Sequence, residues 1–228
     1  MEAMIRIVFI LLLIGTSYVS SSTNNYQIKF YGVPVAEAEI ARSDTTFNGR
    51  PGTVITFTAI SNKLTNFIFP VDNYYRMVID NDTYNILDFQ KRTYQPKVTN
   101  TLSTTRTSEA IFYTGTRIEI PGGVFNIFSL LDYISFNDYS NLINNNFILE
   151  REGILYDARL VSESDYLLLD INKRNNEIGA IEFTDIFTWA VFKDNGMRMI
   201  WIDKDNNYVT RCVFKINGMN LEAVRIDR

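Results

Sequence analysis

The sequence contains no histidine. Histidine is the general base of Ser-His-Asp and Cys-His nucleophilic sites, and it is a frequent ligand of zinc and iron. Its absence excludes these catalytic centres and every histidine-containing metal site. A hydrolase that uses only carboxylates as its acid and base remains compatible with the sequence.

Cysteine occurs once, at Cys212, so no disulfide can form within the chain. Cys212 lies in Tyr208–Lys215, a run with strand character. A buried free cysteine is usually an inert core residue, and Arg211 alone is a weak activator of a thiolate. We therefore expect Cys212 in the core rather than in a reactive site.

The chain also lacks any basic block or basic helix. It has 22 Lys and Arg residues against 26 Asp and Glu residues, so its net charge is −4. Nucleic-acid binding needs a clustered basic surface, so we expect no nucleic-acid partner. By net charge alone, an anionic membrane surface is also an unfavourable partner.

The first 22 residues have a distinct pattern of their own. Met1–Arg6 is short and carries one basic residue, Ile7–Ile14 is an unbroken apolar run, and Gly15–Ser22 is small and polar. This three-part order is typical of a secretory signal peptide. The apolar run is far shorter than the ~20 residues that span a bilayer.

We therefore predict a signal peptide over residues 1–22, with cleavage after Ser21 or Ser22, where small residues stand at the positions that signal peptidase reads. An uncleaved N-terminal anchor is the alternative. No cysteine lies near the boundary, so a lipid-anchored lipoprotein is not indicated. We expect no transmembrane span once the signal peptide is removed.

The remainder has the composition of one folded domain. Hydrophobic residues make up 46% of the chain and aromatic residues 14%, which is enough for a sizeable core. No low-complexity stretch, long linker or convincing repeat divides it. We expect a single domain over residues 23–228.

Alternation of apolar and polar residues is the dominant pattern. A period of 2 in runs rich in Val, Ile, Thr, Phe and Tyr predicts strands with one buried face. Asn-Gly and Asp-Asn pairs accept the positive φ of tight hairpin turns and separate many of the runs. The alternating runs are Tyr26–Phe30, Val54–Thr58, Arg117–Ile120 and Val209–Val213, and Met197–Ile202 is a further run bounded by turn residues. The last third therefore predicts a meander of antiparallel strands.

One segment has a helical period instead. Val124–Phe136 carries apolar residues at positions 124, 127, 128, 131 and 134, which is the i, i+3, i+4, i+7 spacing of one helix face. This predicts a short amphipathic helix that plugs or flanks the sheet. Core packing with no other role is the simpler interpretation of its apolar face.

Acidic residues are the remaining candidates for catalysis, because a glycosidase needs two carboxylates at a set separation. Charged residues on alternating strands usually form a solvated face, so we assign no catalytic residue. The acidic candidates are Glu37, Glu39, Asp80, Asp82, Glu119, Asp132 and Asp185.

Asp203–Asn207 has oxygen-bearing side chains at the spacing of a calcium loop. However, Tyr208 stands where such a loop needs glycine, and Phe214 stands where it needs a bidentate glutamate. We interpret the segment as a hairpin turn and predict no metal site and no cofactor.

Aromatic residues suggest a different function. A curled sheet lined with aromatic side chains can hold a lipid or another apolar ligand, and an ordinary aromatic core is the alternative. The aromatic residues considered are Phe67, Phe69, Tyr74, Tyr75, Phe125, Phe128, Tyr133, Phe183, Phe187, Trp189 and Trp201.

Four stretches, taken in order, resemble an exported bacterial family of domains of unknown function, family 3108. The stretches are Phe30–Glu39, Phe67–Asp80 continuing to Phe89–Arg92, Ile120–Tyr133, and Met199–Asp203 followed by Tyr208–Arg211. The chain departs from the family pattern at Ala36 (usually Gly), Asn126 (usually Asp) and Ser135 (commonly Arg). The resemblance implies an exported, mainly β envelope protein with no established activity.

These observations predict a mainly β fold in a single domain. We expect a strongly curved antiparallel sheet or partial barrel of about ten to twelve strands. One short helix near residues 124–136 packs against it.

Three functions fit this fold. The first is a non-enzymatic exported protein that binds an apolar or glycan-like ligand, or an envelope protein partner. The second is a carboxylate-dependent hydrolase of envelope polymers. The third is an envelope scaffold or assembly factor whose exposed edge strand pairs with a partner.

The binding residues stay open at this level, and the candidates are Tyr75, Asp80, Arg92 and Trp201. The expected location is the periplasm, or the periphery of the outer membrane, of a Gram-negative bacterium. This location follows from the signal-peptide pattern together with the family resemblance.

Overall fold

The computed structural model describes residues 21–107, 110–137, 139–143, 145–175, 180–181, 185–206 and 208–227. The predicted signal peptide lies outside this part of the chain except for Ser21 and Ser22, which begin the first strand. Within the described residues, no helix is long and apolar enough to cross a membrane.

The described residues form fourteen strands in one antiparallel sheet. The mainly β prediction is confirmed, although the strand number exceeds the ten to twelve expected. The strands are β1 (Ser21–Phe30), β2 (Val33–Phe47), β3 (Arg50–Ser61), β4 (Asp72–Asp80), β5 (Ile86–Gln95), β6 (Val98–Arg106), β7 (Ile111–Tyr113), β8 (Glu119–Ile120), β9 (Asn146–Arg151), β10 (Ile154–Ser162), β11 (Leu167–Lys173), β12 (Met197–Asp203), β13 (Tyr208–Ile216) and β14 (Met219–Ile226).

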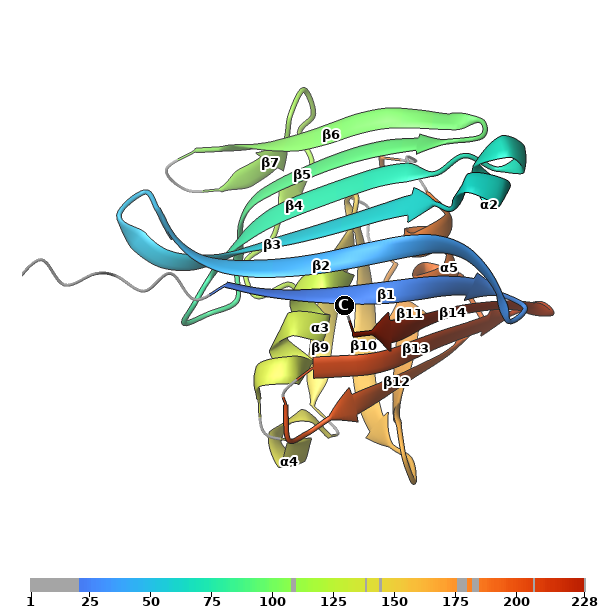
Figure 1. Cartoon of the computed structure of the whole chain (residues 1–228). Coiled ribbons are helices and arrows are strands. Elements are labelled where there is room, and N and C mark those ends of the chain that lie inside the picture. The colour runs from blue at the N-terminus through green and yellow to red at the C-terminus, as the bar shows by residue number, and fades with distance from the viewer. Residues whose placement is uncertain are drawn as a thin grey trace, which may run out of the picture.

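The sheet is a meander that curls into a nearly closed barrel (Figure 1). Strands that are neighbours in the chain are neighbours in the sheet, and β1 also pairs with β14, so β8 and β9 form the two edges. The peptide of Phe125 covers edge strand β9. Its N–H donates to the Ile148 carbonyl at 2.9 Å, and the Glu150 N–H donates to its carbonyl at 2.7 Å.

Tight turns connect the strands as the Asn-Gly pairs predict. Asn217 and Gly218 have φ values of 47° and 84°, in the left-handed region that hairpin turns need. The β1–β2 turn places Tyr31 at φ 51° without the help of an Asn. Its hydroxyl donates to the Gly218 carbonyl at 2.6 Å, which ties the two turns together.

The described residues also form four short helices: α2 (Lys63–Ile68), α3 (Ile127–Phe136), α4 (Tyr139–Leu142) and α5 (Ile186–Phe192). The helix expected over residues 124–136 is confirmed as α3, which lies on the concave side of the sheet (Figure 1). The other three helices were not predicted. The segment that forms α5 is a seven-residue apolar run, and periodicity cannot distinguish such a run from a buried strand.

Asn126 fixes the start of α3. Its side-chain oxygen accepts the Ser129 N–H at 2.9 Å, and its own N–H donates to the Ser129 hydroxyl at 3.0 Å, which completes a capping box. The apolar face of the helix, including Phe128, Leu130 and Ile134, is buried in the core.

Replacing Asn126 with alanine is expected to lower the free energy of unfolding by about 1 to 2 kcal/mol, because the Ser129 N–H at the helix start loses its acceptor. Chemical denaturation measures the loss. Asn126→Ser keeps an acceptor and should retain most of the stability. An Asn126→Ala protein as stable as the original would contradict this assignment.

Candidate functional site

A cavity of about 110 Å³ lies between α3, α5 and the wall made by β1, β2, β3, β13 and β14. We call it the main cavity. Its floor is apolar and includes Ile28, Ala38, Val191 and Val209. A cavity with this lining is the kind that stays dry and accepts apolar groups.

Aromatic rings shape the main cavity. Phe57 of β3 stacks on Phe128 of α3 with ring centroids 4.7 Å apart, and it meets Phe187 of α5 edge-on at 5.7 Å. These three rings come from segments far apart in the sequence, and offset or edge-on pairs of this kind are favourable. The contacts hold both helices against the sheet and leave the cavity between them.

Tyr26 and Cys212 complete the wall on the β1–β13 side. The Tyr26 hydroxyl donates to the Val209 carbonyl at 2.9 Å, and burial raises its pKa. Burial also raises the pKa of the Cys212 thiol to about 12, so the thiol stays protonated at neutral pH. Cys212 is buried, as expected, and behaves here as an apolar wall residue.

The mouth of the main cavity is polar. Arg42 lies 3.1 Å from an Asp132 oxygen, and its guanidinium covers the Phe136 ring at 4.6 Å. Burial raises the pKa of Asp132 to about 6, and the charge of Arg42 opposes that rise. Ser22 and Asn24 of β1 line the same end of the cavity.

A second group of polar residues is buried deeper, and we call it the lysine cluster. Lys91 of β5 is fully buried and contacts two carboxylates, Glu152 and, at 2.9 Å, Asp185. Asp185 also caps α5, accepting the Phe187 and Thr188 N–H groups. The lysine cluster therefore joins one wall of the barrel, the β9–β10 turn and the start of α5.

The pKa values of the two carboxyl groups in the lysine cluster are shifted in opposite directions. Burial opposes ionisation of Asp185, but the charge of Lys91 together with hydrogen bonds from Lys91 and Thr188 outweighs burial and lowers the pKa of that carboxyl. Burial dominates at Glu152 and raises its pKa, with Lys91 opposing. One positive charge thus faces two carboxylates of unequal acidity.

Glu150 is buried beside the lysine cluster. It accepts hydrogen bonds from the Tyr113 hydroxyl at 2.8 Å and the Gly153 N–H at 2.7 Å. Burial nevertheless raises its pKa to about 7. A cavity of about 20 Å³ adjoins Glu150, Glu152 and Tyr75, which is room for one water molecule and no substrate.

The chemistry open to these residues follows from their access. The carboxylates of the lysine cluster are paired and buried, and they do not face each other across a wet cleft as hydrolysis of a polymer requires. Within the described residues, no group of three or more metal-ligating side chains is gathered to hold a metal ion. A wider and more open hollow of about 490 Å³ beside Asn25, Glu37 and Lys63 has a more polar lining. The main cavity is smaller but is lined mostly by apolar side chains, so it is the hollow that suits an apolar ligand.

The structure places the four candidate binding residues apart. Tyr75 is buried with its ring 5.6 Å from the Lys91 nitrogen. Asp80 ends β4 and accepts the Asp82 and Thr83 N–H groups at 3.1 and 2.9 Å, as a turn cap.

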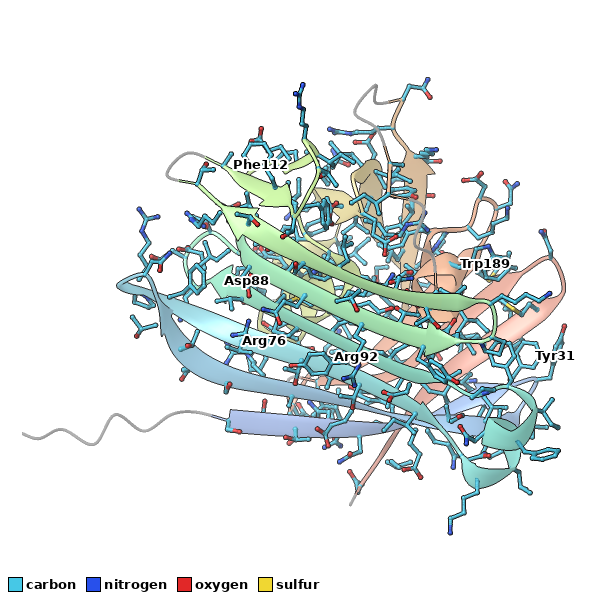
Figure 2. All side chains as sticks on the ribbon, turned by 90° about the horizontal axis from the view of Figure 1, so that it is seen from above. Tyr31, Arg76, Asp88, Arg92, Phe112 and Trp189 are labelled. Atoms are coloured by element: carbon cyan, nitrogen blue, oxygen red, sulfur yellow. The ribbon has the colours of Figure 1, made fainter. Side chains whose placement is uncertain are left out.

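Arg92 and Trp201 belong to the outer surface. Arg92 is 63% exposed on β5 and lies 3.6 Å from Asp72 (Figure 2). Trp201 is covered by the Arg211 guanidinium at 4.7 Å, and its indole N–H donates to Asp165 at 3.2 Å. The four candidates therefore form no common site.

The segment that resembles a calcium loop is a hairpin turn, as interpreted. Asp203 accepts the Asp205 N–H at 3.0 Å and the Asn206 N–H at 3.1 Å. Its carboxylate is thus used to cap the β12–β13 turn, while Asn207 lies outside the described residues.

Sequence reasoning missed Arg42, Lys91, Glu150 and Glu152. A signal existed for Lys91, because the inward-facing positions of β5 alternate through Phe89, Lys91 and Thr93. An inward lysine needs a buried counter-charge. No comparable local signal points to the two glutamates, which flank a turn.

The sheet edges bear on the scaffold interpretation. Edge strand β8 has two residues, and edge strand β9 has six and is already paired to Phe125. Strand addition requires a longer free edge. Strand β7, however, pairs only with Thr104, Thr105 and Arg106 of β6, so residues 98–102 of β6 have one side without a neighbouring strand among the described residues. That stretch is the part of the described barrel to which a partner strand could pair.

No family model matches this chain, and no curated protein sequence matches it. Among solved structures, the chain is similar to the crystal structure of a beta-barrel-like protein of domain of unknown function DUF1849 from Brucella abortus. The TM-score is 0.54 at 6% identity, covering 92% of this chain and 96% of that chain. At this identity the likeness shows the fold alone, a beta-barrel-like fold of unknown function. The resemblance to family 3108 stays a prediction.

Proposed function

We propose that this protein is an exported, non-enzymatic envelope protein that binds an apolar ligand, such as a lipid acyl chain, in the main cavity. The observation that carries the proposal is the apolar, aromatic-lined space of about 110 Å³ beneath a polar mouth. The predicted signal peptide supports an address in the periplasm or at the periphery of the outer membrane.

The size of the main cavity indicates how the ligand sits. Apolar cavities of this order accept a benzene-sized group or several methylenes, each worth about 0.8 kcal/mol when buried. The tip of a chain therefore occupies the floor. The rest of the ligand leaves past Asn24 and Phe136, where Arg42 and Asp132 are placed to meet a polar head.

The lining favours an apolar ligand over a glycan. Sugar hydroxyls need polar partners along their whole length, because a buried polar group without a hydrogen bond is costly. The floor of the main cavity offers Ile28, Phe57 and Val209 instead. The Arg42–Asp132 pair lies at the mouth, whereas Thr188 and Glu222 line the cavity elsewhere. Thr188 is already bonded to Asp185 and Glu222 to Arg211.

A filled cavity should bind less ligand. Ala38→Leu adds a side chain directly into the main cavity, so the affinity for the neutral fluorescent probe N-phenyl-1-naphthylamine should fall by roughly tenfold or more. Probe titration measures the change. Native mass spectrometry of the protein recovered after export should show a co-purifying apolar molecule.

Ala36→Leu is the matched control. Ala36 lies two residues earlier on the same face of β2 and is buried to the same extent, yet it does not line the main cavity. Any general overpacking cost, about 1 to 3 kcal/mol, is shared by both variants. Equal probe affinities in the two variants, together with no co-purifying molecule and no thermal shift with lipids, would refute the proposal.

A further inference from the structure

Large apolar side chains gather in solvent at one end of the sheet. The β1–β2 turn exposes Tyr31 and Val33, and α2 exposes Leu64, Phe67 and Ile68, with Phe67 at 92% exposure. We call these five residues the apolar tip. The β1–β2 turn and α2 lie at the same end of the molecule in both views, and Tyr31 marks that end in Figure 2.

The two parts of the apolar tip are joined. The Asn62 side chain, which caps α2, donates to the Pro34 carbonyl at 2.7 Å, and the Asn62 N–H donates to the Val35 carbonyl at 3.0 Å. None of the residues of α2 is buried. This short helix is therefore held in place by the neighbouring hairpin while its apolar side chains face water, which is costly unless something covers them.

Lysines surround the apolar tip. Four of the strand connections at this end have a lysine in or beside them. These lysines are Lys29 beside the β1–β2 turn, Lys63 in α2, Lys97 in the β5–β6 turn and Lys215 before the β13–β14 turn. The last three are exposed. Acidic residues also lie at this end. Asp72 is paired with Arg92, Glu37 lines one hollow together with Lys63, and Asp194 precedes β12, whose first residue pairs with Lys215.

The opposite end of the same strands is acidic. Asp44 precedes the β2–β3 turn, Asp80 and Asp82 belong to the β4–β5 turn, and Asp203 and Asp205 belong to the β12–β13 turn. A ten-residue strand such as β1 spans about 33 Å. The two ends are thus about three to four Debye lengths apart at physiological salt, so each acts on its surroundings almost independently.

We propose that the apolar tip docks on the surface of a lipid bilayer that contains anionic headgroups. Aromatic and aliphatic side chains on protruding turns enter the boundary between headgroups and acyl chains, and lysines around them contact lipid phosphates. The net charge of −4 does not oppose this docking, because the aspartates of the β4–β5 and β12–β13 turns lie at the far end. Charge complementarity favours an anionic bilayer over an uncharged one.

Docking also orients the protein. Ser22 lies near the start of β1 and Phe30 near the apolar tip, so the mouth of the main cavity is at the end away from the bilayer. The bound protein would present its mouth to the aqueous compartment. This inference is independent of what the main cavity holds.

Vesicle sedimentation tests the docking. The protein recovered after export should sediment with vesicles of phosphatidylethanolamine and phosphatidylglycerol, and much less with pure phosphatidylcholine vesicles. Phe67→Ser combined with Ile68→Ser should weaken binding by roughly tenfold or more. Lys63→Gln and Lys97→Gln should each weaken it about fivefold, and added salt should weaken it further.

Three controls make the result specific. Lys204→Gln removes a lysine from the acidic end and should leave vesicle binding unchanged. Ala38→Leu fills the main cavity and should also leave it unchanged, which separates docking from lipid uptake. Unchanged thermal unfolding of the tip variants shows that they fold.

Wild-type protein that stays in the supernatant would overturn the proposal, and so would tip variants that bind like wild type. If the tip variants instead abolish a concentration-dependent dimer seen by sedimentation velocity, while no variant binds vesicles, a second copy of the chain covers the tip and the bilayer proposal is wrong.

Discussion

Replacing Lys91 with methionine is expected to lower the free energy of unfolding by about 3 to 5 kcal/mol. Lys91 is fully buried and contacts Glu152 and Asp185, so its removal leaves two buried carboxylates without their counter-charge. Chemical denaturation of the purified protein measures the loss. It would be among the largest effects of a single substitution in this chain.

Arg92 supplies the matched control. It is the next residue of β5, points to the other face and is 63% exposed, so Arg92→Met should change stability by less than about 0.5 kcal/mol. A triple variant, Lys91→Met with Glu152→Gln and Asp185→Asn, removes the charges together and should recover much of the loss. Equal stability of the Lys91 and Arg92 variants would show that the lysine cluster does not hold the barrel and α5 together.

Acid should stabilise the protein through Glu150. Burial raises the pKa of this carboxyl from 4.5 to about 7, so the folded state binds its proton more tightly than the unfolded state does. The contribution of Glu150 to the free energy of unfolding is fully present below about pH 4.5 and is lost as the pH rises through about 7. Its size is about 2 to 4 kcal/mol.

Glu150→Gln isolates this contribution, because the amide oxygen still accepts from Tyr113 and Gly153 but does not ionise. The free energy of unfolding of the wild type should fall relative to that of Glu150→Gln between pH 4.5 and 8. Glu163→Gln, at an exposed position after β10, should follow the wild type throughout. Parallel curves for wild type and Glu150→Gln would contradict the prediction.

Of the three functions that the sequence leaves open, apolar-ligand binding has the strongest structural support. The paired carboxylates around Lys91 are enclosed with room for one water molecule, which does not suit polymer hydrolysis. Edge strands β8 and β9 are short or already paired, which does not suit strand addition there, and only residues 98–102 of β6 offer a free edge. The main cavity has both the lining and the mouth that a chain-like ligand needs.

Local sequence patterns predicted several of the strands and the longest helix. Strand β13 follows from alternation in Val209–Val213, strand β12 from the run Met197–Ile202 between two turn signals, and α3 from its helical spacing. These signals depend on residues within a few positions of each other. The helices α2 and α5 were not predicted, because one or two turns of helix are too short to show a helical period in the sequence.

The residues of the candidate site could not be predicted from local sequence patterns. Tyr75, Asp80, Arg92 and Trp201 were chosen for residue type, and the sheet disperses them between the interior, a turn and the outer surface. Phe67 and Phe128 are both aromatic residues in apolar segments, yet one is 92% exposed and the other lies in the core. Residue type alone does not distinguish them.

By itself, the sequence determined the β class, many of the turns, the inert character of Cys212 and the exclusion of histidine chemistry, because these depend on composition and on near neighbours. The tertiary structure alone decided which side chains meet. Lys91 and Glu152 are 61 positions apart, and Tyr26 and Val209 are 183 apart. Only the curl of the sheet, with β1 paired to β14, brings such pairs together and leaves an apolar cavity between them.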